Sequence, residues 1–253
     1  MATKKVELLI KRQDRRDGAS YWEEFSVPHE PGMNVISCLQ AVAEQAETKD
    51  GKKTSPVAWD CNCLEEVCGA CSMLINDRVR QACSALVDNL LAEEGGTIRL
   101  EPMTKFPVVR DLVVDRSRMF ENLKRVKAWI PVDGYYDMGE PPLMSPAQQE
   151  EGYPLSRCMS CGCCVEACPQ VNDRSDFIGP AVISQVVLFN THPTGKKNAD
   201  ERLDELKGPG GIAECGTAQN CVTDCPKDIP LTDSIAKAGR ATTVRALKRM
   251  FDR

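Results

Sequence analysis

Fourteen cysteines stand among 253 residues, and two groups of them in the C-terminal half have a spacing that can do chemistry. The first group follows the pattern C-x2-C-x2-C-x3-C-P with Cys158, Cys161, Cys164 and Cys168. Chains that carry this pattern twice bind two cubane iron–sulfur clusters, and the fourth cysteine of each run ligates the other cluster. The second group fits the template with one member missing, because Ala218 stands where its second cysteine belongs. Its remaining members are Cys215, Cys221 and Cys225.

The exchange of the fourth ligand divides these thiolates unequally between two clusters. One set is complete and predicts a [4Fe–4S] cluster on Cys158, Cys161, Cys164 and Cys225. The other set holds only three thiolates, Cys168, Cys215 and Cys221. A cubane corner without a ligand readily loses its iron, so the second set predicts [3Fe–4S]. Such a chain is expected to move single electrons.

The N-terminal half carries a cysteine motif of a different kind. Cys63, Cys68 and Cys71 give C-x4-C-x2-C, and Cys83 follows after a short apolar stretch. This is the spacing of plant-type [2Fe–2S] sites. Gly69 would let the backbone pass close to the sulfurs, so that amide N–H groups could bond to them. The fourth thiolate is expected to come from a nearby strand.

The elements around this motif predict a β-grasp fold. Lys5–Lys11 and Tyr21–Val27 alternate between apolar and polar residues and are separated by a short gap, which predicts a hairpin. Val35–Glu47 has helical spacing of apolar residues. Ser72–Ile75 and Thr97–Leu100 are further expected strands.

The remainder of the chain is expected to be helical, which makes the fold class α+β. A β-grasp plant-type ferredoxin domain over residues 1–106 precedes an all-α, bacterial-ferredoxin-like domain over residues 107–253. Pro102 and Pro107 mark Met103–Val114 as the crossover, and Gly134–Ser156, rich in Pro, Gly and charge, is expected to be extended. The expected helices are Asp115–Trp129, Phe177–Phe189 (buried), Asn198–Leu206 (exposed) and the amphipathic Asp233–Phe251.

Composition excludes several classes of protein. The net charge of −5 argues against a general nucleic-acid binder. Met1–Gln13 has no secretory pattern, so the thiols are expected to be reduced. The longest apolar run, Ala181–Phe189, is far below the roughly 20 residues that span a bilayer. There are only two histidines, His29 and His192, which argues against a Rieske centre or a bis-histidine haem in this chain, and we interpret both as surface residues.

Zinc is the main alternative for clustered cysteines. A zinc site needs four ligands per ion, usually in two separated pairs, and the dense run from Cys158 to Cys168 fits this poorly. Three cysteines remain after eleven ligands are assigned. Cys38 is interpreted as a core thiol and Cys163 as a packing residue, whereas Cys61 could replace Cys63 as a ligand.

Two charged features have both a functional and a structural interpretation. Arg110 and Asp111 could act as a functional pair, but an ion pair within the fold is at least as good an explanation. The basic face of the last predicted helix could meet an anchor subunit or anionic lipid, or be simply solvated. Its residues are Lys237, Arg240, Arg245, Lys248 and Arg249. No residue resembles a catalytic nucleophile, acid or base.

With these motifs, the chain resembles the iron–sulfur subunit of succinate dehydrogenase and fumarate reductase, from about Val6 to Arg249. Beyond the cysteines, the resemblance lies in Pro107–Asp115 and Phe177–Ala181. It implies [2Fe–2S], [4Fe–4S] and [3Fe–4S] clusters in that order along an electron path. It also implies a flavoprotein partner with covalent FAD, and a membrane anchor, often with haem b, that passes electrons to quinone. The chain would then be peripheral to the cytoplasmic face of the cell membrane.

The chain departs from many members of this family beside the predicted three-iron site. Those members place a tryptophan shortly after the position of Pro169 and a histidine directly after that of Cys215. Here Gln170–Ser175 contains no tryptophan, and Gly216 stands at the second position. The hypothesis is that this chain does not supply the usual quinone pocket. Electrons would pass to haem or to a quinone site in the anchor, as in enzymes with two-haem anchors, which commonly use menaquinone.

Three functions therefore remain open. The first is a subunit of succinate:quinone oxidoreductase, and the second is the same architecture working as fumarate reductase. Cluster motifs do not separate these two directions. The third is a free-standing ferredoxin-like carrier with diffusible partners, against which stands the joining of two unlike ferredoxin modules.

Overall fold

The computed structural model describes residues 4–93, 95–130 and 142–251, which form two compact units. The first unit contains Met1–Arg116 together with Cys161–Cys163. The second contains Ser117–Ser160 and Cys164–Arg253. The short segment Cys161–Cys163 thus belongs with the N-terminal unit, although its neighbours on both sides belong with the other.

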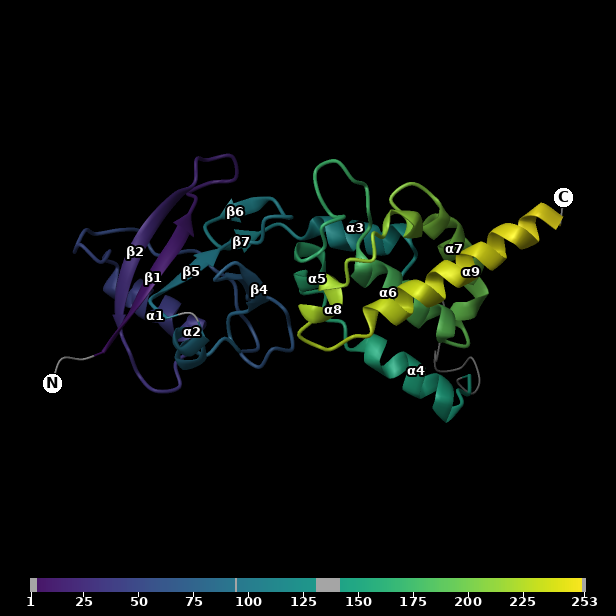
Figure 1. The fold of residues 1–253 in the computed structure, drawn as a ribbon, viewed down its shortest axis with the longest axis horizontal. Helices are drawn as coiled ribbons and strands as arrows, with labels where there is room; N and C mark the ends of the chain where they lie inside the picture. The colour runs from purple at the N-terminus through teal and green to yellow at the C-terminus, as the bar shows by residue number, and fades with distance from the viewer. Residues whose placement is uncertain (1–3, 94, 131–141, 252–253) are drawn as a thin grey trace, which may run out of the picture. The chain divides into compact units, whose positions relative to one another are not determined.

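The first unit is built on a five-stranded mixed sheet of β-grasp type (Figure 1). The strand order is β2-β1-β5-β3-β4, with β1 parallel to β5 and the other pairs antiparallel. The strands are β1 (Lys5–Arg12), β2 (Tyr21–Pro28), β3 (Ser72–Ile75), β4 (Arg78–Gln81) and β5 (Thr97–Glu101). The predicted hairpin is confirmed, because Lys5 pairs with Pro28 and Arg12 with Tyr21.

Two helices pack against this sheet, α1 (Val35–Gln45) and α2 (Val87–Glu93). Asn34 caps α1, since its side-chain oxygen accepts from the Ser37 amide at 2.9 Å, while its Nδ2 donates to the Cys83 carbonyl at the same distance. Cys38 is fully buried in the core, as predicted for a core thiol. The cap therefore joins the start of α1 to the turn that carries the fourth predicted [2Fe–2S] ligand.

The sequence interpretation missed several short elements of the first unit. Strand β4 pairs with β3 across Asn76 and Asp77, which have φ values of 49° and 62°. Such a pair in the left-handed region is typical of a two-residue hairpin turn. Helix α2 was also missed, and the expected crossover contains a small hairpin of β6 (Val108–Arg110) and β7 (Val113–Val114).

A fully buried ion pair joins this small hairpin to the main sheet. Arg12 Nε lies 2.9 Å from Asp111 Oδ1, and both side chains have no exposed surface. Asp111 also accepts from the amides of Gln13 at 3.0 Å and Ala58 at 2.8 Å. Burial opposes the charge on Arg12, but the hydrogen bond and charge of Asp111 outweigh it and raise the pKa of Arg12. Arg110 Nε lies 3.8 Å from Asp111 Oδ2, which is a distant contact. Of the two residues Arg110 and Asp111, only Asp111 therefore has a clear structural role.

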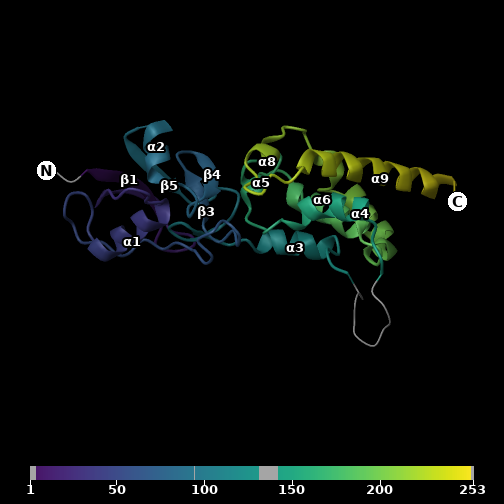
Figure 2. The ribbon, with the colours of Figure 1, turned by 90° about the horizontal axis from the view of Figure 1, so that it is seen from below.

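The second unit is helical (Figure 2). Its helices are α3 (Ser117–Arg125), α4 (Pro146–Ser156), α5 (Cys163–Glu166, whose first residue belongs to the first unit), α6 (Pro180–Thr191), α7 (Ala199–Lys207), α8 (Asn220–Thr223) and α9 (Leu231–Phe251). Two 3-10 turns, η1 (Gly195–Asn198) and η2 (Ile212–Glu214), complete it. Among the described residues, no helix is both long and apolar enough to cross a bilayer.

Helix α4 corrects one expectation. The segment from Gly134 to Ser156 was expected to be extended; residues 134–141 lie outside the described part, but Pro146–Ser156 is helical. Ser145 and Gln148 form a reciprocal capping box, and Pro146 occupies a first-turn position, where it costs no hydrogen bond. These start signals outweigh the local richness in proline and charge.

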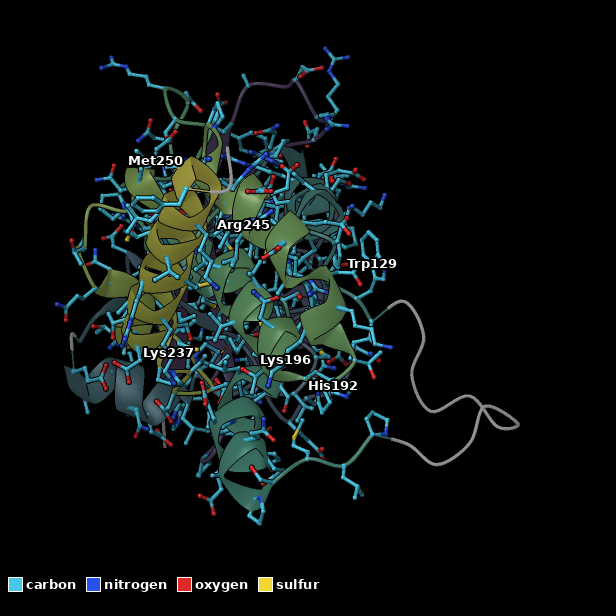
Figure 3. The ribbon with its side chains drawn as sticks, turned by 90° about the vertical axis from the view of Figure 1, so that its right-hand side faces the viewer. Trp129, His192, Lys196, Lys237, Arg245 and Met250 are labelled. Carbon is cyan, nitrogen blue, oxygen red and sulfur yellow. The ribbon has the colours of Figure 1, made fainter. Side chains whose placement is uncertain are left out.

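Helix α9 packs against α6 and α7, and Figure 3 shows Lys237, Arg245 and Met250 along its length. Helix α7 was expected to be exposed, but Arg202, Leu203 and Leu206 are buried. Arg245 of the predicted basic face lies 2.8 Å from Asp200 and 3.4 Å from Asp204, two residues of α7. Part of the basic face therefore forms ion pairs within the second unit.

This charge contact predicts a dependence of stability on pH. Burial of Asp204 opposes its ionisation, but the hydrogen bond from Arg245 and the charges of Arg249 and Arg245 lower its pKa from the ordinary value of an aspartate. A lowered pKa stabilises the fold above the unfolded value, and this stabilisation is lost as pH falls through the folded value. Asp204→Asn should reduce the free energy of unfolding by roughly 0.5–1 kcal/mol at pH 7. Urea unfolding at several pH values should show the difference shrinking below pH 4; an equal loss at every pH would contradict this account.

Candidate metal centres

The loop that carries Cys63 directs backbone amides at its sulfur. Cys63 Sγ accepts from the amides of Glu65 at 3.4 Å, Val67 at 3.3 Å and Cys68 at 3.3 Å. Leu64 and Glu66 lie in the left-handed region, with φ values of 61° and 54°, and so turn the loop around the thiol. The amides of Glu65 and Val67, then the Cys68 side chain, lower the pKa of Cys63 to about 6. This environment favours a thiolate and fits an iron ligand.

The other predicted [2Fe–2S] ligands lie in the same region of the first unit. The Ala70 amide donates to Cys68 Sγ at 3.5 Å. Burial raises the pKa of Cys71 to about 12, opposed by the backbone hydrogen bond of Cys83 and helped by the hydrogen bond and charge of the Cys83 side chain. Cys83 lies in the turn after β4 rather than on the strand itself. Partial burial of exposed Cys61, and then the charges of Cys68, Asp60, Cys83 and Cys63, raise the pKa of its thiol, so Cys61 lies beside the same group.

Arg116 donates hydrogen bonds to the backbone of the predicted [2Fe–2S] loop and was not recognised from the sequence. Its Nη1 donates to the Gly69 carbonyl at 2.6 Å and its Nη2 to the Ala70 carbonyl at 2.8 Å. Ser72 Oγ donates to the same Gly69 carbonyl at 2.9 Å. Nothing local in the sequence indicates a contact between residues more than 40 positions apart.

Gly69 approaches Cys161 so closely that no side chain fits between them. A Cβ at Gly69, whose φ is +73°, would lie 2.7 Å from Cys161 Cβ and 2.8 Å from its Cα. Cys161 is half-buried and belongs to the first unit. A hydrogen bond from the Cys163 side chain lowers its pKa to about 7 against desolvation, helped by the Cys163 backbone and the charge of Arg116. The backbone of the predicted [2Fe–2S] loop at Gly69 therefore contacts Cys161, which is a predicted [4Fe–4S] ligand.

Gly69→Ala is expected to disrupt this contact. Left-handed φ costs a residue other than glycine about 1–2 kcal/mol, and forcing a methyl group into packed atoms costs about 1–3 kcal/mol more. Gly51→Ala is the matched control, because Gly51 has a φ of +77° but nothing within 4 Å of the added Cβ. Visible absorbance per protein and urea midpoints would compare the two variants. Equal effects would show that backbone strain, not the close approach, limits position 69.

In the second unit, Cys168, Cys215 and Cys221 line one hollow with Ala218 (Figure 1 shows its elements α8 and α9). Burial, and then the charges of Cys168 and Cys215, raise the pKa of Cys221 to about 11. The position that lacks a cysteine in the template therefore faces the same space as the three thiols.

The predicted [4Fe–4S] ligands lie on separate short elements. Cys158 follows α4, Cys164 lies in α5, and Cys225 follows α8. Cys164 is buried, whereas Cys158 and Cys225 are half-buried. Within the described ranges, no three or more His, Cys, Asp or Glu side chains converge tightly enough to hold a single metal ion.

Comparison with known proteins follows the same division of the chain. Residues 7–121 match the 2Fe-2S iron-sulfur cluster binding domain family, and residues 154–229 match the 4Fe-4S dicluster domain family. The succinate dehydrogenase iron-sulfur subunit of Bacillus subtilis is 55% identical over 248 residues, which cover 98% of this chain and 96% of that protein. This chain belongs to the family of succinate dehydrogenase iron–sulfur subunits. The resemblance inferred from the motifs is thus confirmed, as is the α+β fold class.

The family also includes relatives named for the reverse reaction. The fumarate reductase iron-sulfur subunit of Wolinella succinogenes is 29% identical over 218 residues, covering 85% of this chain and 87% of that protein. A chain of the Mycobacterium smegmatis Sdh1 complex in the apo form shares the fold, with a TM-score of 0.76 and 24% identity over 96% of this chain and 98% of that one. These comparisons establish the family and the fold; the individual ligands stay predictions.

Proposed function

We propose that this chain is the electron-transfer subunit of a succinate dehydrogenase, and that its cysteines hold three iron–sulfur clusters. The observation that carries the proposal is the 55% identity to a succinate dehydrogenase iron-sulfur subunit across nearly the full length of both chains. When bound, the clusters supply sites that accept and release one electron at a time. The chain itself supplies the thiolates, their spacing and their shielding from water.

The residues around the predicted sites support the assignment of three separate cysteine sets to three clusters. Cys63, Cys68, Cys71 and Cys83 would hold [2Fe–2S], where backbone amides already point at Cys63 and Cys68. Cys168, Cys215 and Cys221 would hold [3Fe–4S] in the hollow that Ala218 leaves without a fourth thiol. The complete set for [4Fe–4S] is Cys158, Cys161, Cys164 and Cys225.

The proposed partners follow from the family. They are a flavoprotein with FAD that oxidises succinate and a membrane anchor with haem b, so the chain would lie at the cytoplasmic face of the membrane. Membership in the family supports these partners, and the 55% identical relative favours succinate oxidation over the fumarate reductase alternative. Purification through a tag on this chain should bring the other subunits with it. Purification of this chain alone from solubilised membranes would instead favour the free-standing carrier.

The side-chain packing beside the three-thiol hollow supports a quinone site located in the anchor. A Cβ at Gly216 would overlap Gln170 Nε2 and lie 3.0 Å from Gln170 Cδ. The Gln170 amide thus lies over the position where many family members carry a histidine. We infer that electrons leave towards haem or quinone, most consistently menaquinone, in the anchor.

Gln170→Ala tests this part of the proposal. If quinone is bound by the anchor, the variant complex should keep kcat/KM for a menaquinone analogue within about threefold of the wild type, since no transition-state contact is lost. Succinate oxidation with an artificial acceptor is the matched measurement for the electron path itself. A loss above roughly tenfold with quinone alone would place Gln170 in the quinone site.

A further inference from the structure

The side chain of Gln81 lies between a predicted [2Fe–2S] ligand and a cysteine with no assigned role. Gln81 is the last residue of β4, and its side chain is fully buried. Its Oε1 lies 3.6 Å from Cys71 Sγ. Its Nε2 lies 2.8 Å from Ser72 Oγ and 3.3 Å from Cys163 Sγ. Cys163 is also fully buried and belongs to the first unit.

The direction of one of these hydrogen bonds conflicts with iron binding. In the structure, the Cys71 thiol donates to the amide oxygen of Gln81. A cysteine that binds iron is a thiolate and has no hydrogen to donate. The amide oxygen would then face an anionic sulfur in a site where Cys71 and Gln81 are shielded from water. A half-turn about the last side-chain torsion of Gln81 removes this conflict, because it presents the N–H group to Cys71.

The groups at the other end of the amide can accommodate the half-turn. The amide oxygen would then face Cys163 and Ser72. The Ser72 hydroxyl can donate to it, and the Cys163 thiol can do so by turning its one hydrogen from Cys161 to the amide oxygen. Ser72 at present donates to the Gly69 carbonyl, but Arg116 donates to that same carbonyl at 2.6 Å. The hydroxyl can therefore turn to Gln81 without leaving a buried carbonyl unsatisfied.

We propose that Gln81 is a positioning residue of the [2Fe–2S] site, which donates an N–H···S hydrogen bond to Cys71 and is oriented by Cys163 and Ser72. The proposal rests on the assignment of Cys71 as a ligand. A hydrogen bond to a ligand sulfur stabilises the more negative, reduced form, so this bond raises the reduction potential. It also gives Cys163 a role as the buried hydrogen-bond donor that keeps the amide turned towards the sulfur.

The test is a redox titration of the complex, followed by EPR of the reduced [2Fe–2S] centre. Gln81→Met removes the donor and keeps a side chain of similar length. It should lower the potential, with a shift of the one-electron equilibrium of roughly tenfold, or about 59 mV. Gln40→Met is the control, because Gln40 is an exposed glutamine on α1 in the same unit. Its potential should equal that of the wild type.

A spectroscopic signature separates hydrogen bonding from a general loss of packing. Electron–nuclear double resonance on the reduced centre should show an exchangeable proton coupling in H2O that Gln81→Met lacks. Cys163→Ser, which keeps a donor, should retain the coupling, whereas Cys163→Ala should weaken it and lower the potential by a smaller amount. Wild-type potential and coupling in Gln81→Met, with the [2Fe–2S] signal intact, would overturn the inference alone. Absence of a [2Fe–2S] signal in the wild-type complex would instead overturn the proposed function.

Discussion

Ala218→Cys is expected to convert the three-iron centre into a four-iron centre. Ala218 lines the same hollow as Cys168, Cys215 and Cys221, so a thiol at this position faces the space that the cluster would occupy. It also restores the missing cysteine of the C-x2-C-x2-C-x3-C-P template. The oxidised three-iron EPR signal should be almost lost, and one more iron should be found per protein.

The reduction potential of this centre should fall at the same time. A fourth thiolate adds negative charge, which disfavours the reduced form, and a shift on the order of 100 mV is within the range that cluster type and charge produce. Ala213→Cys is the matched control, because Ala213 lies in η2 close by in the chain but does not line the hollow. An unaltered three-iron signal and potential in Ala218→Cys would show that the template has been misread.

Asp111→Ala is expected to destabilise the first unit strongly. It removes a buried carboxylate that accepts hydrogen bonds from Arg12 and from the amides of Gln13 and Ala58. Arg12 would remain fully buried with Glu23 as its only carboxylate partner among the described residues. Breaking a buried ion pair from one side costs about 3–5 kcal/mol, a large part of the stability of a typical domain.

Arg110→Ala provides the control for this prediction. Arg110 is adjacent in sequence, but its side chain is 46% exposed and its Nε is 3.8 Å from Asp111 Oδ2, so its removal should cost less than about 0.5 kcal/mol. Urea-dependent loss of the visible absorbance of the [2Fe–2S] site would measure both. Equal midpoints for the two variants would contradict the structural role of the buried pair.

The ligand sets are predictions from cysteine spacing, which the sequence shows directly because most members of each set lie within one short run. The β1–β2 hairpin was equally predictable, since alternation of apolar residues sets both its register and its buried face. The four-residue strand β4 was too short for a periodic signal, and only the turn at Asn76 and Asp77 marked it.

The polar residues that support the predicted sites could not be found in this way. Arg116 reaches carbonyls 46 and 47 positions away, and Gln81 reaches a thiol 82 positions away. Their partners are set by how the chain folds back on itself, and an isolated arginine or glutamine in a sequence is most often a solvated residue. The structural role of Arg12 could not be predicted for the same reason, since its partner Asp111 lies 99 positions further along the chain.

Low-temperature EPR on the anaerobically isolated complex, first oxidised and then reduced in steps, tests the central claim most directly. A three-iron signal is expected in the oxidised sample, and a [2Fe–2S] signal is expected on mild reduction. Together these would establish the unequal division of ligands that Ala218 implies. Only four-iron signals, or no paramagnetic iron at all, would contradict it and return the chain to the carrier and zinc interpretations.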